Sequence, residues 1–252
     1  MHEAAARGFG RGADDYERAR PGYPADVIEL LARVMPIRPR SRVCDLAAGT
    51  GKLTRLLLGT GADIVAIEPV PAMRRKLNVI CPDVKVIDGT AEAIPLEDES
   101  IDVLTVGQAF HWFANAEAVG EIARVLRPAG GLALLWNLND ESVPWVRDVE
   151  RIVFEHGGND RPYTAGDPEP VIAASGRFTP MTLDTFTNHV AITKDLVVTR
   201  VASTSFISAL PDAEREACLT AVRQCLESHP GTAGVDRFDY PYLTAVYWCH
   251  RR

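Results

Sequence analysis

The sequence predicts a doubly wound α/β fold, and three observations lead to this prediction. Between residues 42 and 136, short apolar segments typical of β-strands alternate with segments that have helical spacing. A glycine-rich turn follows the first of these strands, as in open sheets that bind ligands at the carboxyl ends of their strands. The length of 252 residues and the 46% share of hydrophobic residues suit one large globular domain. The alternation predicts a parallel sheet covered by helices on both faces.

The expected elements of the first half begin with a helix after Pro24 and end with a strand at Trp136. Pro24 suits the first turn of a helix, and the two prolines at 36 and 39 end that helix. Each expected strand is a short apolar run, which is typical of a strand buried on both faces. Strands are expected at 42–46, 64–67, 84–87, 101–106 and 131–136, with helices at 53–58, 71–79 and 116–126.

The pattern is less regular after Trp136. Helices are expected at 143–155 and 212–227, and strands at 181–187 and 240–249 that close the sheet at one edge. The stretch 157–170 is rich in glycine and proline, and we expect a lid or a substrate-side insertion there. The predicted organisation is a flexible tail at 1–15 and a single domain at 16–252. Within it, the cofactor-binding core is 40–137 and the substrate-side, sheet-closing region is 138–252.

Composition argues against several classes of protein. The net charge of −7, with 27 basic against 34 acidic residues, disfavours a nucleic-acid partner. The first residues lack the apolar core of a secretory signal, and no apolar run approaches the ~18 residues of a membrane span. Five cysteines without a C-x-x-C pair suit a reducing compartment, so we expect a cytoplasmic protein that binds no membrane. The six histidines are scattered, and no metal site is predicted.

The turn after the first strand distinguishes among three classes of cofactor. A phosphate-binding loop needs glycine five residues before Gly51 and serine or threonine two residues after it, but Leu46 and Leu53 stand there. A dinucleotide-binding turn prefers glycine or alanine at the position of Thr54. The carboxylate of Asp45 would repel a pyrophosphate but suits a ligand that carries an ammonium and a sulfonium group.

Four segments in order carry a resemblance to a known family. The first is the D-x-x-x-G-x-G turn of Asp45, Gly49 and Gly51, and the second is the acid Glu68 after the second strand. The third is Asp-Gly-Thr-Ala-Glu at 88–92, and the fourth is the strand and His-Trp-Phe loop at 101–113. Together with the turn at 125–131, these segments resemble the class I S-adenosylmethionine-dependent methyltransferases, specifically the small-molecule branch with a type 11 methyltransferase domain. The resemblance covers roughly 40–137, and residues 16–24 resemble a segment of one subgroup.

The resemblance implies a Rossmann-like sheet of seven strands, mostly parallel with an antiparallel edge strand, and S-adenosylmethionine as the cofactor. Alanine stands at position 47 where the family commonly has glycine. Glu68 would hold the ribose hydroxyls, and residues 90 and 91 would frame the adenine. The implied cofactor-binding residues are Asp45, Ala47, Gly49, Gly51, Glu68, Thr90, Ala91, Gln108 and Arg20. The expected substrate pocket contains Tyr23, His111, Trp112, Trp136 and Asn137.

His111 is the candidate catalytic residue, because it follows a central strand at its carboxyl end. The alternative is that His111 packs between its aromatic neighbours. Methyl transfer is an in-line displacement that depends chiefly on positioning, so a base is needed only for an acceptor that is not yet nucleophilic. The sequence predicts a small-molecule acceptor but leaves open its identity, its O, N, C or S atom, and the oligomeric state. Two other functions remain open: a nicotinamide-dependent oxidoreductase and a non-catalytic S-adenosylmethionine-binding protein.

Overall fold

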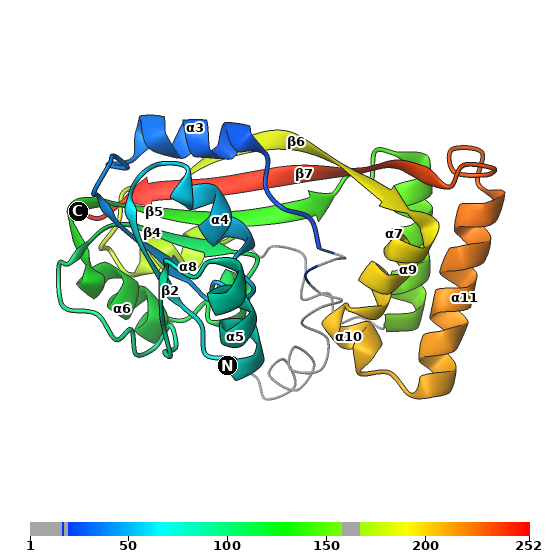
Figure 1. Ribbon diagram of the computed structural model, residues 1–252, viewed down its shortest axis with the longest axis horizontal. Helices are drawn as coiled ribbons and strands as arrows, with labels where there is room; N and C mark the ends of the chain where they lie inside the picture. Colours follow the sequence, from blue (N-terminus) through cyan, green and yellow to red (C-terminus); the bar gives the residue numbers. More distant parts are fainter. Residues whose placement is uncertain (1–16, 18–19, 158–166) are drawn as a thin grey trace.

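A single seven-stranded sheet runs the length of the molecule in the computed structural model, which describes residues 17, 20–157 and 167–252 (Figure 1). The order of the strands across the sheet is β3-β2-β1-β4-β5-β7-β6. The strands are β1 (Arg42–Leu46), β2 (Asp63–Ile67), β3 (Lys85–Ile87), β4 (Ile101–Gly107), β5 (Leu126–Asn139), β6 (Thr182–Thr193) and β7 (Arg237–His250). The predicted mostly parallel sheet is confirmed. The expected tail at 1–15 and most of the expected lid at 157–170 lie outside the described residues.

The antiparallel pairing is confined to one side of the sheet. Strands β1 to β5 pair with one another in parallel, whereas β7 runs antiparallel to both β5 and β6. The antiparallel strand therefore lies one position in from the edge, and β6 is the outermost strand. Both strands are longer than predicted, because their ladder continues from Thr182 paired with Trp248 to Thr193 paired with Arg237. The length of β6 and of β7 is set by how far each strand pairs with its neighbour, and a local sequence pattern does not show this.

Alternate residues of the central strands pack against helices on opposite faces of the sheet. Along β5, Leu132 and Leu134 belong to the core under α6 (Ala116–Val125) and α8 (Glu169–Ala174). Ala133 and Leu135 belong to the core under α3 (Ala25–Val34), α4 (Lys52–Leu58) and α5 (Pro71–Ile80). This period-two burial on two faces explains why the central strands are mostly apolar. The carboxyl ends of β1, β2 and β4 lie next to two cavities, described below.

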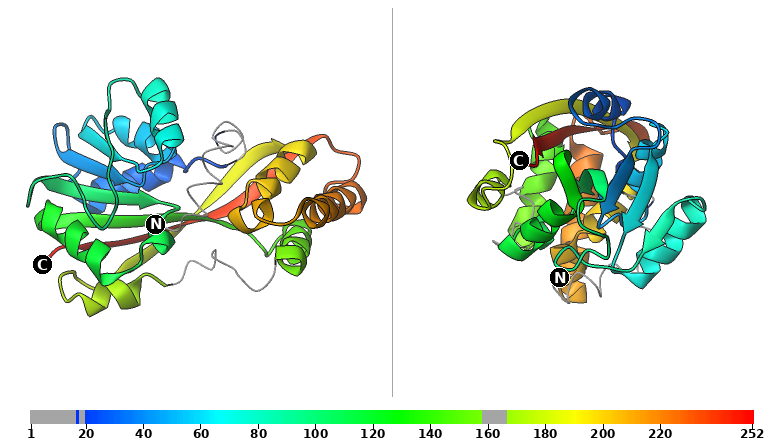
Figure 2. Two further views of the ribbon diagram at one scale, coloured as in Figure 1. Left: turned by 90° about the horizontal axis from the view of Figure 1, so that it is seen from below. Right: turned by 90° about the vertical axis from the view of Figure 1, so that its left-hand side faces the viewer.

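A second lobe has a hydrophobic core of its own. Helices α7 (Pro144–Gly157), α9 (Lys194–Ala202), α10 (Ser205–Ser208) and α11 (Asp212–Ser228) surround the far ends of β6 and β7. Figure 2 shows this lobe set apart from the other helices and joined to them by the long strands. Helices α7 and α11 were expected from the sequence, whereas α8, α9 and α10 were not. No helix among the described residues is long and apolar enough to cross a membrane.

Helix α9 shows why the second half is difficult to predict. Its sequence, KDLVVTRVA, contains three valines, which favour a strand by propensity. Burial of Val197, Val198 and Val201 in the core of the second lobe outweighs that preference. Thr193 also caps the helix, because its Oγ1 accepts a hydrogen bond from the backbone N–H of Leu196 at 3.3 Å.

Candidate functional site

The turn at residues 47–51 joins β1 to α4 at the carboxyl end of β1. Ala47, Gly49 and Gly51 have positive φ angles of 55°, 57° and 89°. A Cβ atom at Gly51 would lie 3.0 Å from Leu77 Cδ1, so both the backbone conformation and the packing of α5 require glycine there. A Cβ atom at Gly49 would have no neighbour within 4 Å. The backbone of the turn therefore faces open space at Gly49.

Glu68 follows β2 and ties it to this turn. Its Oε2 accepts a hydrogen bond from the backbone N–H of Gly49 at 2.8 Å, and its Oε1 accepts one from the N–H of Val70, also at 2.8 Å. The residue is only 4% exposed, and this burial raises the pKa of the carboxyl group. Each carboxylate oxygen can accept more than one hydrogen bond, so the group can still bind hydroxyl groups of a ligand.

Asp45 lies near the end of β1 and has no solvent exposure. Its Oδ2 accepts a hydrogen bond from the Thr54 hydroxyl at 2.5 Å, and its Oδ1 accepts one from the Thr105 hydroxyl at 3.3 Å. Burial raises the pKa of Asp45 to about 7, although both hydroxyls act in the opposite direction. A buried carboxyl group with such a pKa is a common feature of ligand sites.

The first cavity opens beside Glu68. It has an empty volume of about 750 Å³, including the space at its mouth. Its walls are mostly apolar and include one buried acid, which suits a flat ligand with a few polar groups. The walls come from the turns after β1, β2, β3 and β4: Leu46, Ala47, Gly49, Glu68, Pro69, Val70, Met73, Gly89, Thr90, Ala91, Glu92, Gly107, Gln108, Ala109, Trp112 and Phe113.

The second cavity adjoins the first and is more polar. It has an empty volume of about 650 Å³ and shares five wall residues with the first: Ala47, Gly49, Gly107, Gln108 and Trp112. Its other walls include Asp45 and Lys52 from the sheet side and Arg20 and Tyr23 from the segment before α3. It therefore contains side chains of both charges, which suits a zwitterionic group.

The strap, defined here as Glu17 and residues 20–23, covers the second cavity and runs from α3 toward the second lobe (Figure 1). At one end, Glu17 accepts a hydrogen bond from the Thr50 hydroxyl at 2.5 Å and pairs with Arg55 at 2.7 Å. At the other end, the carbonyl oxygen of Gly22 accepts hydrogen bonds from two asparagine amides, Asn137 at 3.0 Å and Asn188 at 2.9 Å. Arg20 Nη2 also donates a hydrogen bond to the carbonyl oxygen of Ser203, at the end of α9, at 3.5 Å, so the strap contacts both lobes.

The loop after β4 carries His111 in a short 3-10 helix, Phe110–Trp112. The Trp136 indole N–H donates a hydrogen bond to His111 Nδ1 at 3.5 Å, so Nδ1 acts as an acceptor. The rings of His111 and Trp112 lie 4.8 Å apart. Burial lowers the pKa of His111 to about 4, so the imidazole is neutral near pH 7.

Comparison with known proteins identifies the family. Residues 44–134 match the family described as a methyltransferase domain. The chain is 40% identical over 236 residues to an uncharacterized methyltransferase of Mycobacterium tuberculosis (strain ATCC 25618 / H37Rv), and the match covers 94% of this chain and 92% of that protein. The chain belongs to the class I S-adenosylmethionine-dependent methyltransferases. Membership of this family excludes the nicotinamide-dependent oxidoreductase that the sequence left open. It also means that S-adenosylmethionine is the methyl donor.

Solved structures agree with the fold of the methyltransferase. A putative methyltransferase from an antibiotic biosynthesis pathway of Anabaena variabilis superposes with a TM-score of 0.63 at 18% identity, over 91% of this chain and 98% of that chain. A geranyl diphosphate methyltransferase solved in complex with S-adenosylmethionine gives a TM-score of 0.50 at 14% identity, over 90% of this chain and 85% of that one. At these identities the likeness concerns the fold alone.

Most of the residues predicted to bind the cofactor line the two cavities of the methyltransferase. These are Asp45, Ala47, Gly49, Glu68, Thr90, Ala91, Gln108 and Arg20. Gly51 is not a wall residue of either cavity, because it packs against α5 as described above. Ala47, which replaces the family's usual glycine, adopts a left-handed conformation at a cost of roughly 1 to 2 kcal/mol.

The residues predicted for the substrate pocket separate into two groups. Tyr23 and Trp112 line the second cavity. His111, Trp136 and Asn137 are not wall residues of either cavity. Trp136 is 2% exposed and belongs to the core under α6, and the Asn137 side chain holds the strap. Contact of these three residues with an acceptor stays a prediction.

Sequence reasoning did not single out several residues of the site. Met73 and Val70 could have been proposed because they follow Glu68 on the same turn and helix. No local pattern placed Glu17 or Asn188 at the site. Glu17 contacts Thr50, 33 residues away in the sequence, and Asn188 contacts Gly22, 166 residues away. Among the described residues, no three or more His, Cys, Asp or Glu side chains gather as metal ligands do.

Proposed function

We propose that the methyltransferase acts on a small molecule bound beside the cofactor, beneath the strap. The second cavity supports this proposal, because it adjoins the first cavity and is walled on one side by Arg20, Pro21 and Tyr23 of the strap. The Tyr23 hydroxyl would lie 2.5 Å from a Cβ atom at Gly107, so the phenol sits directly over the end of β4. A bulky polymer would have to displace this cover. The net charge of −7 also disfavours a nucleic-acid acceptor.

The charges of the two cavities support an orientation for the cofactor. Glu68 in the apolar first cavity suits the ribose hydroxyls, with residues 90 and 91 beside the adenine. Arg20 in the second cavity complements the carboxylate of the methionine moiety, and Asp45 complements its ammonium group, which in turn favours the ionised form of Asp45. S-adenosylmethionine supplies an electrophilic methyl group on its sulfonium. The residues of the chain bind, orient and shield the reacting groups from water.

We further propose that positioning, rather than proton abstraction by His111, accounts for catalysis. A neutral imidazole with a pKa near 4 is a weak base, and Trp136 already occupies its Nδ1. The acceptor is then a group that is nucleophilic without a base at neutral pH, such as a carboxylate or a thiolate. A cytoplasmic location completes the proposal, because all five cysteines are free.

A mass-spectrometric screen tests the class of acceptor. The protein and S-adenosylmethionine are incubated with separate panels of small acids, thiols, phenols and amines, and with peptides and RNA. We expect one added methyl group on a small acid or thiol and none on the polymers. Methylation of peptides or RNA alone would refute the small-molecule proposal. Methylation of phenols or amines alone would refute catalysis without a base.

The substitution Arg20→Gln tests whether Arg20 binds the cofactor or the acceptor. If Arg20 binds the methionine carboxylate, the dissociation constant of S-adenosylmethionine should rise about ten- to a hundred-fold while the acceptor KM stays constant. If only the acceptor KM rises, Arg20 belongs to the acceptor site and the proposed orientation of the cofactor is wrong. Arg38→Gln, an exposed arginine outside both cavities, is the matched control.

A further inference from the structure

We propose that Arg124 is a positioning residue that sets the affinity for S-adenosylmethionine by fixing the loop that forms the adenosine side of the first cavity. Arg124 lies at the end of α6 and is not a wall residue of either cavity. The loop in question, residues 88–100, connects β3 to β4 and includes Gly89, Thr90, Ala91 and Glu92 of the cavity wall. The proposal rests on the proposed placement of the adenosine in the first cavity.

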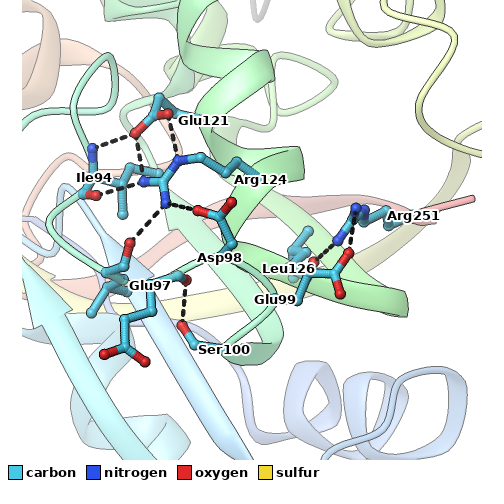
Figure 3. Close-up of polar contacts among 10 residues, drawn as sticks. Ile94, Glu97, Asp98, Glu99, Ser100, Glu121, Arg124, Leu126 and Arg251 are labelled. Carbon is cyan, nitrogen blue, oxygen red and sulfur yellow. Dashed lines mark hydrogen bonds and ion pairs between the residues drawn. The ribbon is translucent and has the colours of Figure 1, made fainter.

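The Arg124 guanidinium holds the backbone of this loop directly (Figure 3). Its Nη2 donates a hydrogen bond to the carbonyl oxygen of Ile94 at 2.8 Å, and its Nη1 donates one to that of Leu96 at 2.9 Å. Nη1 also pairs with the Asp98 carboxylate at 2.7 Å. The loop itself contains one β-bridge, between Thr90 and Ala93. One planar side chain thus satisfies two backbone acceptors that lie beyond this bridge.

Glu121, one turn earlier on α6, completes the clamp. Its Oε1 accepts from Arg124 Nε at 2.7 Å, and its Oε2 accepts from Arg124 Nη2 at 2.8 Å. The same Oε2 accepts the backbone N–H of Ile94 at 2.9 Å. Both backbone polar groups of Ile94 are therefore bound by α6. The hydrogen bonds from Arg124 lower the pKa of Glu121, so the carboxylate stays charged at neutral pH.

Pro95 transmits this clamp to the cavity wall. It lies between Ile94 and Leu96, the two residues that Arg124 holds. A Cβ atom at Gly89 would lie 2.6 Å from Pro95 Cδ, so Pro95 packs directly on the backbone of Gly89. Gly89 is itself a wall residue of the first cavity. Displacement of the clamped segment would therefore move the wall that faces the adenosine.

A second arginine offers a matched control on the same loop. Arg251 donates hydrogen bonds to the Glu99 carboxylate at 2.9 Å and to the carbonyl oxygen of Leu126 (Figure 3). It fixes the far end of the loop, away from the residues that line the cavity. Loss of either arginine removes surface ion pairs and hydrogen bonds, but only Arg124 holds the segment that packs on Gly89.

The experiment compares Arg124→Gln, Arg124→Lys and Arg251→Gln by calorimetry and steady-state kinetics. We expect both Arg124 variants to raise the dissociation constant and KM for S-adenosylmethionine about ten-fold or more, with kcat and the acceptor KM within about two-fold. The Ile94 amide should also exchange hydrogen faster. Arg251→Gln should leave cofactor affinity unchanged. Equal affinity in folded Arg124 variants, or equal loss in Arg251→Gln, would overturn the proposal.

Two further variants test the clamp and the placement of the adenosine separately. If the Arg124 variants do not fold, Glu121→Gln weakens the bond to the Ile94 N–H while retaining the arginine, and unchanged cofactor affinity there would overturn the proposal. Ala91→Leu fills the first cavity and tests the placement of the adenosine independently. Undiminished cofactor binding by Ala91→Leu would mean that the placement itself is wrong. Loss of binding by Ala91→Leu, with normal binding by the clamp variants, would mean that the clamp alone is wrong.

Discussion

The two lobes of the methyltransferase differ in what their side chains do. The cofactor lobe is the part of the molecule that contains strands β1 to β4 and helices α3 to α6 and α8. Its Asp45 and Glu68 are buried acids whose pKa values are raised by burial, and neither forms an ion pair with another described residue. In the second lobe, Trp145 packs edge to face against Phe238 and Tyr240, with ring centroids 5.2 and 5.0 Å away. Burying the two acids lowers the stability of the folded protein but leaves polar groups that can bind a ligand. The aromatic packing in the second lobe contributes stability.

This difference teaches that cofactor affinity and folding stability reside largely in different parts of the chain. The second lobe has its own hydrophobic core and reaches the site through Ser203, whose carbonyl oxygen accepts a hydrogen bond from Arg20 of the strap. Substitutions in that core should lower stability with little effect on cofactor binding. Substitutions at the turn after β1 should lower cofactor affinity by more than any stability that they lose would explain. Four substitutions test this separation.

Trp145→Ala should have the largest effect, and it should act on stability. Removing a buried tryptophan that contacts two aromatic rings costs roughly 3 to 5 kcal/mol, or a Tm lower by roughly 6 to 20 °C. The dissociation constant of S-adenosylmethionine, measured on folded protein by calorimetry, should change less than about two-fold. Arg147→Ala on the exposed side of the same helix is the control. A large loss of cofactor affinity in Trp145→Ala would contradict the separation of the lobes.

Gly49→Val should abolish cofactor binding, with affinity reduced at least about a hundred-fold. Valine resists the φ of +57°, and its side chain would project into the space that both cavities share. Gly176→Val is the matched control, because Gly176 also has a positive φ, of +64°, and open space, but lies away from both cavities. The two variants should lose similar stability, and only Gly49→Val should lose binding. Normal binding by Gly49→Val would show that the turn does not contact the cofactor.

Glu68→Gln should weaken S-adenosylmethionine binding about ten- to a hundred-fold, because a charged acceptor for the ribose hydroxyls becomes neutral. Glutamine is preferred to alanine because Glu68 also accepts the backbone N–H groups of Gly49 and Val70, and truncation would leave both unpaired. Asp63→Asn, at the exposed start of the same strand, is the control. An unchanged dissociation constant for Glu68→Gln would remove this residue from the cofactor site.

His111→Asn should have the smallest effect on rate, at most a few-fold in single-turnover measurements between pH 6 and 8. Because the pKa of folded His111 is about 4, below its ordinary 6.5, the unfolded chain binds the proton more tightly. The stability contributed by neutral His111 is therefore full above pH 6.5 and is lost as the pH falls toward 4. The asparagine variant should lack this part of the acid destabilisation in Tm measurements. A rate lowered ~10²- to 10⁴-fold would instead establish His111 as a general base.

Local patterns were sufficient to predict the strands and most of the helices of the cofactor lobe. Asp45, Gly49 and Gly51 lie within seven consecutive residues, so one strand and one turn place them together whatever the rest of the chain does. Glu68 is predictable because β2 pairs with β1 in parallel, which brings the ends of two successive strands to the same edge of the sheet. The short, mostly apolar strands indicated burial on both faces, because side chains alternate between the two faces of a sheet.

Only the tertiary structure decided how the site is closed and supported. The strap is held by Asn188, 166 residues from Gly22, and that contact depends on the register of β6 on β7 rather than on any local spacing. The state of His111 was equally inaccessible, because its lowered pKa comes from burial among side chains of other elements. Arg124 is an ordinary charge near the end of a helix until the fold places the β3–β4 loop against it. Spacing along the chain predicts neighbours within an element or between successive strands, whereas packing alone brings together residues that are distant in the sequence.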